Sequence, residues 1–156
     1  MEFDWYEGSF EDLIPDDLHL EMVQCWNGTG MDDQGRVYIG FTSYRDARKS
    51  EDFVVFRYDP RTGERTFLGS FQDIAAANNN LQEGESIPKG HTRMIFADGV
   101  MYMGFQGFHD FNREIKELPN YRGSHIFPMI LGPNPGWICQ SICPAALSPS
   151  GKVSWP

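Results

Sequence analysis

The sequence predicts an all-β protein, and three observations support that fold class. Sixteen Gly and ten Pro among 156 residues indicate many turns between short strands. Apolar residues make up 40% of the chain and aromatic residues 14%, which is the composition of a packed domain and not of a disordered one. A pattern also recurs: Gly35–Phe41 reads GRVYIGF, and Gly99–Phe105, 64 positions later, reads GVMYMGF. Such internal similarity is typical of repeat folds.

Charge and cysteine content exclude several classes of function. The net charge of −9 argues against non-specific binding to nucleic acid or to an anionic membrane. Three cysteines are too few and odd in number for a disulfide framework, and the Cys139/Cys143 pair is more typical of small strand residues than of a metal site. We see neither a membrane-spanning apolar stretch nor a secretory signal, so the default expectation is a cytoplasmic protein.

The first 71 residues predict a leader and one four-stranded unit. Residues 1–20 form an acidic leader, of which 8–13 are expected to be the last strand of a preceding unit. Residues 21–71 form the first unit, with strands expected at 36–42, 52–58 and 64–71. Pro60 and Gly63 suit the second position and the left-handed closing position of the turn between the last two strands.

The second half of the chain repeats this pattern after a linker. Residues 72–90 link the two units, and 73–81 are a candidate for a short helix, against which the Asn78–Asn80 run argues as a poor helix former. Residues 91–142 form the second unit, and 143–156 the start of a third. Asp98-Gly99 predicts a tight hairpin, since both residues tolerate the positive φ that the turn requires. The expected strands of the second unit are 91–97, 100–106, 124–131 and 137–142.

Four antiparallel strands per unit are the content of one β-propeller blade. The YDPRTG hairpin at 58–63 and the two Gly-x-x-Tyr-x-Gly-Phe strands resemble bacterial propellers: the quinoprotein-like group, the seven-bladed lactonase-like group and the lyases typified by oligogalacturonate lyase. The resemblance implies two consecutive four-stranded blades with partial flanking blades. The catalytic pattern of those families is not matched, so no catalytic role is carried over.

Closure of a propeller requires at least about four blades. We therefore expect this chain to be part of a longer protein, the alternative being several copies assembled into a ring. In either case the remaining blades, or self-association, would cover the exposed blade faces.

An antiparallel unit places alternate connections at the same end, and three histidines are expected there. The connections 44–51, 72–90 and 107–123 should share that end, where long loops on a rigid scaffold often bind ligands. Imidazole groups can transfer protons or bind a divalent metal. His91 and His109 are the candidate catalytic residues, and His91, His109 and His125 the candidate metal ligands. The alternative is that they are solvated or strand-capping residues.

The same end carries candidate substrate-binding residues. Arginine pairs with carboxylates through two hydrogen bonds, and aromatic rings stack on sugars. A mixed-charge, solvated loop is the alternative for this segment. The candidates are Arg93, Gln106, Tyr121 and Arg122.

Three functions remain open from the sequence. The first is binding of a carbohydrate or protein ligand through the loops of one face. The second is part of a propeller lyase or hydrolase that acts on an acidic carbohydrate through a histidine-based site. A quinoprotein-like dehydrogenase ranks last, because the sequence has no tryptophan-rich repeat and no adjacent cysteine pair.

Overall fold

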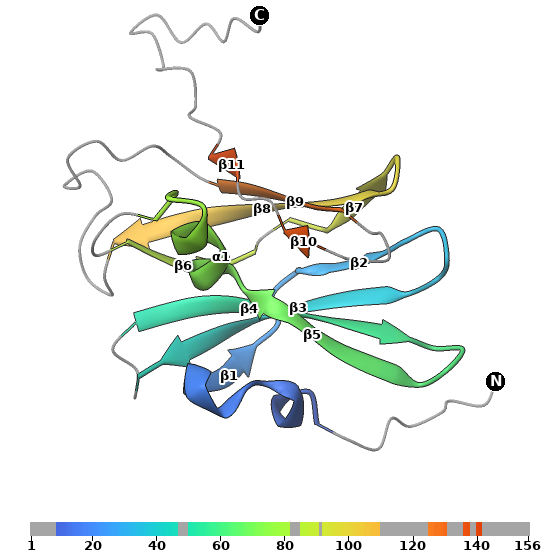
Figure 1. Cartoon of the computed structure of the whole chain (residues 1–156), viewed down its shortest axis with the longest axis horizontal. Helices are drawn as coiled ribbons and strands as arrows, with labels where there is room; N and C mark the ends of the chain where they lie inside the picture. The colour runs from blue at the N-terminus through green and yellow to red at the C-terminus, as the bar shows by residue number, and fades with distance from the viewer. Residues whose placement is uncertain are drawn as a thin grey trace, which may run out of the picture.

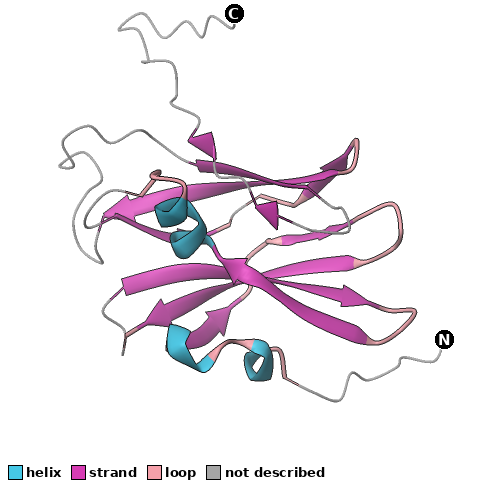
Figure 2. Ribbon diagram, in the orientation of Figure 1, coloured by secondary structure: helices cyan, strands magenta, loops and turns pink. Residues whose placement is uncertain are grey.

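The computed structural model contains two antiparallel β-sheets, with one helix between them at one end (Figures 1 and 2). It describes residues 9–46, 50–81, 85–90, 92–109, 125–130, 136–137 and 140–141. Sheet 1 contains β1 (Leu20–Gln24), β2 (Thr29–Met31), β3 (Val37–Arg45), β4 (Ser50–Asp59) and β5 (Glu64–Ser70). Sheet 2 contains β6 (Glu85–Lys89), β7 (Ile95–Ala97), β8 (Val100–His109), β9 (His125–Ile130), β10 (Gly136–Trp137) and β11 (Gln140–Ser141).

The strands follow a similar order in the two sheets. In sheet 1, β1 and β2 both pair with β3, which is followed by β4 and β5. In sheet 2, β6 and β7 both pair with β8, which is followed by β9 and then by β10 and β11. All pairings are antiparallel, so the expected all-β class is confirmed at that level. The two Tyr-x-Gly-Phe segments lie in β3 and β8, which belong to different sheets.

The predicted hairpin turns have the expected backbone geometry. Asp98 and Gly99 both have positive φ, at 50° and 79°, which matches the twist of the strands that they join. At the turn between β4 and β5, the Gly63 amide donates to the Asp59 carbonyl at 2.8 Å, and Gly63 has a φ of 73°. Glycine suits these positions because it has no Cβ to clash in this region.

Several sequence expectations about local structure are corrected. Residues 85–89, expected in the linker, form β6 and pair with β8, and within the expected strand 91–97 only Ile95–Ala97 is a described strand. Instead of a strand, the segment after Ser9 forms two short 3-10 helices, η1 (Glu11–Leu13) and η2 (Asp16–Leu18), with local hydrogen bonds and Pro15 between them. Of the connection expected over 44–51, residues 44, 45, 50 and 51 are strand residues instead, because Tyr44 pairs with Glu51 and Arg45 with Ser50. Residues 107–109, expected to begin a long loop, belong to β8, which continues as far as His109.

The core lies between the two sheets and is completed by α1 (Phe71–Ala77). The helix is capped by Ser70, whose hydroxyl accepts the Asp73 amide, so it begins two residues before the span expected from the sequence (73–81) and ends at Ala77, four residues before the end of that span. Phe71 is fully buried, with ring centroids 4.3 Å from Phe105 and 4.5 Å from Phe127. The helix therefore fixes the connection between the sheets through an aromatic cluster.

The ring of Phe53, also fully buried, occupies space left by three glycines. A Cβ on Gly28 would lie 2.7 Å from the ring and one on Gly90 would lie 2.9 Å from it, while one on Gly40 would be closer still. The ring centroid is 5.0 Å from that of Phe105 in sheet 2. The glycines thus allow an aromatic ring of sheet 1 to contact the aromatic core of sheet 2.

Candidate functional site

The first strand of each sheet is interrupted at a similar place. In sheet 1 the interruption separates β1 from β2, and in sheet 2 it separates β6 from β7. The Gly28 carbonyl accepts the Gly40 amide at 2.7 Å, and the Thr92 hydroxyl bonds to both the amide and the carbonyl of Gly104. Each interruption is therefore hydrogen-bonded to the neighbouring strand, which is β3 in sheet 1 and β8 in sheet 2.

The two interrupted strands meet directly. The Met94 amide donates to the Thr29 carbonyl at 3.0 Å, and nearby the Thr42 hydroxyl of β3 donates to the Pro88 carbonyl of β6 at 2.7 Å. Gly30 permits this approach, since a Cβ there would lie 2.5 Å from the Cβ of Met94. Side chains displayed by the two interruptions consequently share one edge of the molecule.

An exposed tryptophan and two cations occupy this edge. Trp26 is 50% exposed, and the Lys89 ammonium lies 5.2 Å from the centroid of its ring. This cation–π contact joins a residue of sheet 1 to a residue of sheet 2. Asn27 and Arg93 are also exposed, and Arg93 makes no ion pair with any carboxylate in the described part of the chain. We call Trp26, Asn27, Lys89 and Arg93 the edge site.

The electrostatics near the edge site favour binding over nucleophilic chemistry. Burial raises the pKa of the Cys25 thiol, partly opposed by a hydrogen bond with the Gly28 backbone, so the reactive thiolate is disfavoured. Burial also raises the pKa of Glu51, and the positive charge of Lys89 acts in the opposite direction. The edge site therefore offers cations and an aromatic face, without an activated nucleophile among the described residues.

The structure brings together few of the residues expected from the sequence. Arg93 is exposed in the edge site, while Gln106 lies in β8 opposite Lys89. His109 is the last residue of β8, opposite Glu85, and not a loop residue as expected; His125 begins β9, opposite Phe105. Within the described residues, no group of three or more His, Cys, Asp or Glu could hold a metal ion. His91, Tyr121 and Arg122 lie outside the described residues.

A buried carboxylate lies near the end of β3 and β4 at which Arg45 pairs with Ser50. Asp52 accepts from the Ser70 hydroxyl at 2.6 Å and from the Arg45 guanidinium at 2.9 Å. Its other oxygen accepts the amides of Phe53 and Gln72. Burial raises the pKa of Asp52, although these hydrogen bonds oppose the rise. Because both oxygens are occupied, the group ties β3, β4 and α1 together and is poorly placed for catalysis.

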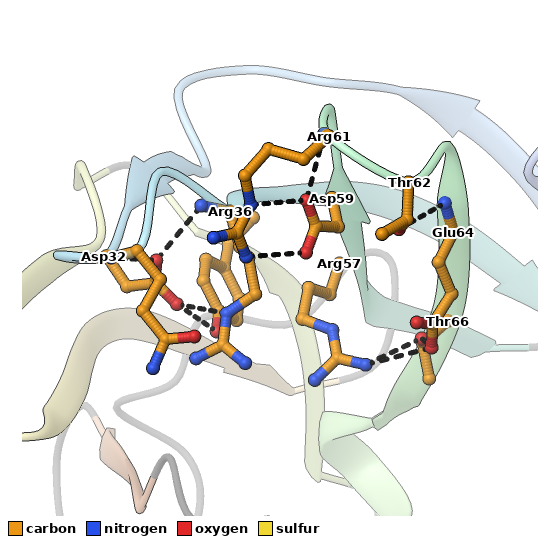
Figure 3. A network of polar contacts seen from close by, with 10 residues as sticks. Asp32, Arg36, Arg57, Asp59, Arg61, Thr62, Glu64 and Thr66 are labelled. Atoms are coloured by element: carbon orange, nitrogen blue, oxygen red, sulfur yellow. Dashed lines mark hydrogen bonds and ion pairs between the residues drawn. The ribbon is translucent and has the colours of Figure 1, made fainter.

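A second polar network closes the turns at the opposite end (Figure 3). The Asp32 carboxylate accepts the Arg36 guanidinium at 2.6 Å and the Tyr38 hydroxyl at 3.0 Å. Burial and the neighbouring Asp32 raise the pKa of Tyr38, so its hydroxyl remains a donor. In the adjacent turn, the Arg61 guanidinium holds the pKa of Asp59 at about 2. Both carboxylates thus stabilise turns.

Sequence reasoning missed Trp26 and Lys89. The sequence held one weak signal for Trp26. The repeat offset of 64 residues relates Asn27 to the candidate His91, and Trp26 directly precedes Asn27. Neither residue belongs to a motif, and their contact across two sheets depends on how the interrupted strands pack.

Comparisons with known proteins give no relative for this chain. No family model, no curated protein and no solved structure matches it. Among the described residues, no helix is long and apolar enough to cross a membrane.

Proposed function

We propose that this chain is a pair of propeller-type blades whose edge site binds an acidic carbohydrate. The observation that carries the proposal is the half-exposed Trp26 ring with Lys89 beside it, and the exposed Arg93 four residues farther along the same interrupted strand as Lys89. An aromatic face suits the apolar face of a sugar ring, and the cations suit its carboxylate.

The arrangement of the sheets supports the propeller part of the proposal. The first strands of the two sheets are joined through Met94 and Thr29, while α1 fills the space beside β4, β5 and β6 (Figure 1). Neighbouring blades around a common axis require their first strands to be in contact near the axis, and other elements to occupy the wider space between the sheets away from it. The proposal would then place the edge site on strands that line the axis.

Local charge supports an anionic ligand over a neutral one. The chain as a whole carries −9, so anions are repelled at long range and only a local cluster of cations can hold one. Lys89 at the end of β6 and Arg93 within the interruption that follows are two such cations four positions apart, and the charge of Glu51 near Lys89 offsets them only in part.

Calorimetric titration with oligogalacturonate, and with its methyl-esterified form as the neutral counterpart, tests the proposal. The acid form should bind and the ester should bind at least about tenfold more weakly, the equivalent of about one charge-assisted contact. Trp26→Ala should weaken binding of both forms, whereas Arg93→Gln should weaken only the acid form. Arg61→Gln is the matched control, because it removes an exposed cation from the opposite end. Equal binding by Trp26→Ala and the unmodified protein would refute the assignment.

Ultraviolet absorbance of the same protein–oligogalacturonate mixtures separates binding from turnover. A lyase would release an unsaturated product, detected by its ultraviolet absorbance, and this would favour the enzyme alternative with His91 and His109. Binding without product favours the binding module.

A further inference from the structure

Glu51 lies on the face of sheet 1 that is turned towards sheet 2. It pairs with Tyr44, and the next pair along the same face is Thr42 with Phe53, whose ring lies in the core between the sheets. Side chains two positions apart on a strand share a face, so the Glu51 side chain points towards sheet 2, as Phe53 does. Glu51 is half-buried there, next to the strand pair that meets sheet 2.

Two contacts place Lys89 beside this face. The Thr42 hydroxyl donates to the carbonyl of Pro88, the residue before Lys89, at 2.7 Å. The Phe53 ring lies 2.9 Å from the position that a Cβ would take on Gly90, the residue after Lys89. Lys89 therefore passes within side-chain reach of the carboxylate that stands one strand pair farther along.

Lys89 is consequently shared between an aromatic ring and a carboxylate. Its ammonium lies 5.2 Å from the centroid of the Trp26 ring, and its positive charge also acts on Glu51. An ionised Glu51 offsets the charge that Lys89 presents to an anionic ligand, whereas a protonated Glu51 does not. Burial raises the pKa of Glu51 above its ordinary 4.5, although Lys89 opposes the rise, so Glu51 takes up its proton at a pH where a sugar carboxylate is still ionised.

We propose that Glu51 regulates the edge site: when ionised it weakens the hold of Lys89 on an anionic ligand, and when protonated it releases Lys89 to bind that ligand. This inference rests on the proposed function of the edge site and adds a dependence on pH to it. Mild acidification should strengthen binding of an acidic carbohydrate and leave binding of a neutral one unchanged.

The other charged or titratable groups on the elements around Glu51 are common to the proteins to be compared. β5 pairs with β4 only from Val54 onwards, so its charges lie farther away. Because the remaining groups are the same with and without a Glu51 substitution, any difference between the two pH profiles belongs to Glu51. The described groups are Glu21 on β1, Tyr44 and Arg45 on β3, Asp52 on β4, Asp73 on α1, Glu85 and Lys89 on β6, and Cys25 and Arg93 in the interruptions; Arg48, Lys49 and His91 lie outside the described residues.

Calorimetric titration with oligogalacturonate and its methyl ester, from about pH 7.5 to about pH 4.5, tests the proposal. The unmodified chain should bind the acid form about three- to tenfold more tightly at the lower pH, the effect of one nearby charge. Glu51→Gln should bind it tightly at both ends of the range and lose most of the pH dependence. Glu64→Gln is the matched control, because this carboxylate is 62% exposed and pairs with Arg57 at the far end of β4, and it should keep the unmodified profile.

Lys89→Met shows whether Glu51 acts through Lys89. Methionine keeps an unbranched apolar side chain next to Trp26 and removes the charge. In this background Glu51→Gln should improve binding of the acid form by less than half the factor seen in the unmodified chain, since no ammonium remains for Glu51 to offset. An equal improvement in both backgrounds would mean that Glu51 repels the ligand directly, and it overturns the proposal.

Iodide quenching of Trp26 fluorescence tests the same response without a sugar. It is measured as the difference between the unmodified chain and Trp26→Phe. Iodide is an anion, so its quenching should increase on acidification in the unmodified chain and be high throughout in Glu51→Gln. Quenching by acrylamide, which is neutral, should not change with pH.

The two measurements separate the failure of this proposal from failure of the carbohydrate function. Absence of oligogalacturonate binding together with the expected iodide response refutes the carbohydrate function and supports the role of Glu51. Iodide quenching that does not change with pH, or equal pH profiles for the unmodified chain and Glu51→Gln, overturns the role of Glu51. The carbohydrate function is then judged by the titration at neutral pH.

Discussion

Substituting Gly40 and Gly104 by alanine tests the packing of the two sheets with one chemical change at two related positions. Both glycines occupy the same place in the Tyr-x-Gly-Phe segments, and neither has a positive φ. A Cβ on Gly40 would meet the Phe53 ring closer than 3.0 Å, whereas one on Gly104 would meet only Thr92, at 3.4 Å and beyond. The two substitutions therefore differ mainly in what the added methyl group contacts.

The expected magnitudes follow from this difference. Overpacking a buried site lowers the free energy of unfolding by about 1–3 kcal/mol. Replacing glycine by alanine raises it by about 0.4–1 kcal/mol, because the unfolded chain loses conformational entropy. Gly40→Ala should lose about 1–2 kcal/mol of unfolding free energy, or about 2–8 °C in midpoint for a chain of this size. Gly104→Ala should be neutral or gain up to about 1 kcal/mol.

Urea and thermal unfolding followed by circular dichroism measure both variants. A third substitution, Phe53→Leu, shortens the ring that Gly40→Ala displaces, so it should cost less in that background than in the unmodified chain. Equal midpoints for Gly40→Ala and Gly104→Ala, or simple additivity with Phe53→Leu, would show that the ring is not confined by Gly40.

Three further predictions concern the polar networks. Arg61 holds the pKa of Asp59 at about 2, below the ordinary 3.8, so its stabilisation is present above pH 3.8 and is lost as pH falls towards 2. In Asp59→Asn, the stability measured by fluorescence should therefore depend less on pH between about 3.8 and 2 than in the unmodified chain. Ser70→Ala should cost about 1–3 kcal/mol in urea unfolding, because it removes both the cap of α1 and a hydrogen-bond donor to the buried Asp52. Tyr38→Phe removes one donor to the buried Asp32 and should cost about 1–3 kcal/mol, measured the same way.

Each network prediction has a clear contrary result. Unchanged acid unfolding after Asp59→Asn would mean that the carboxylate keeps its ordinary pKa in the folded protein. An unchanged midpoint after Ser70→Ala would mean that α1 does not need its cap, and a neutral Tyr38→Phe would mean that water replaces the lost donor.

Local signals predicted much of the fold. Asp98-Gly99 and the Asp59–Gly63 turn specify their hairpins through residues that adopt positive φ, and the strands around them follow from β-branched and aromatic runs. The ends of strands were less accessible to sequence reasoning. Arg45 and Ser50 read as loop residues because they are polar, yet they pair because the β3–β4 ladder continues outward.

The candidate site was less predictable than the fold. Histidines attract attention from sequence alone, but His109 proved to be a strand residue paired with Glu85. Trp26 and Lys89 lie 63 positions apart and meet only because two interrupted strands from different sheets come together. Contacts of this kind depend on long-range packing, which neither periodicity nor short motifs encode.

The open edges of the two sheets are built to discourage recruitment of extra strands. The first strand of each sheet is divided into short pieces, and β6 contains Pro88, which has no amide to donate to a neighbouring strand. Edge-on growth of the amyloid type requires a long, regular row of free amides and carbonyls. The first strands, where the two sheets meet, therefore resist fibre formation through edge-on pairing, whereas β5 at the other edge of sheet 1 is a continuous strand.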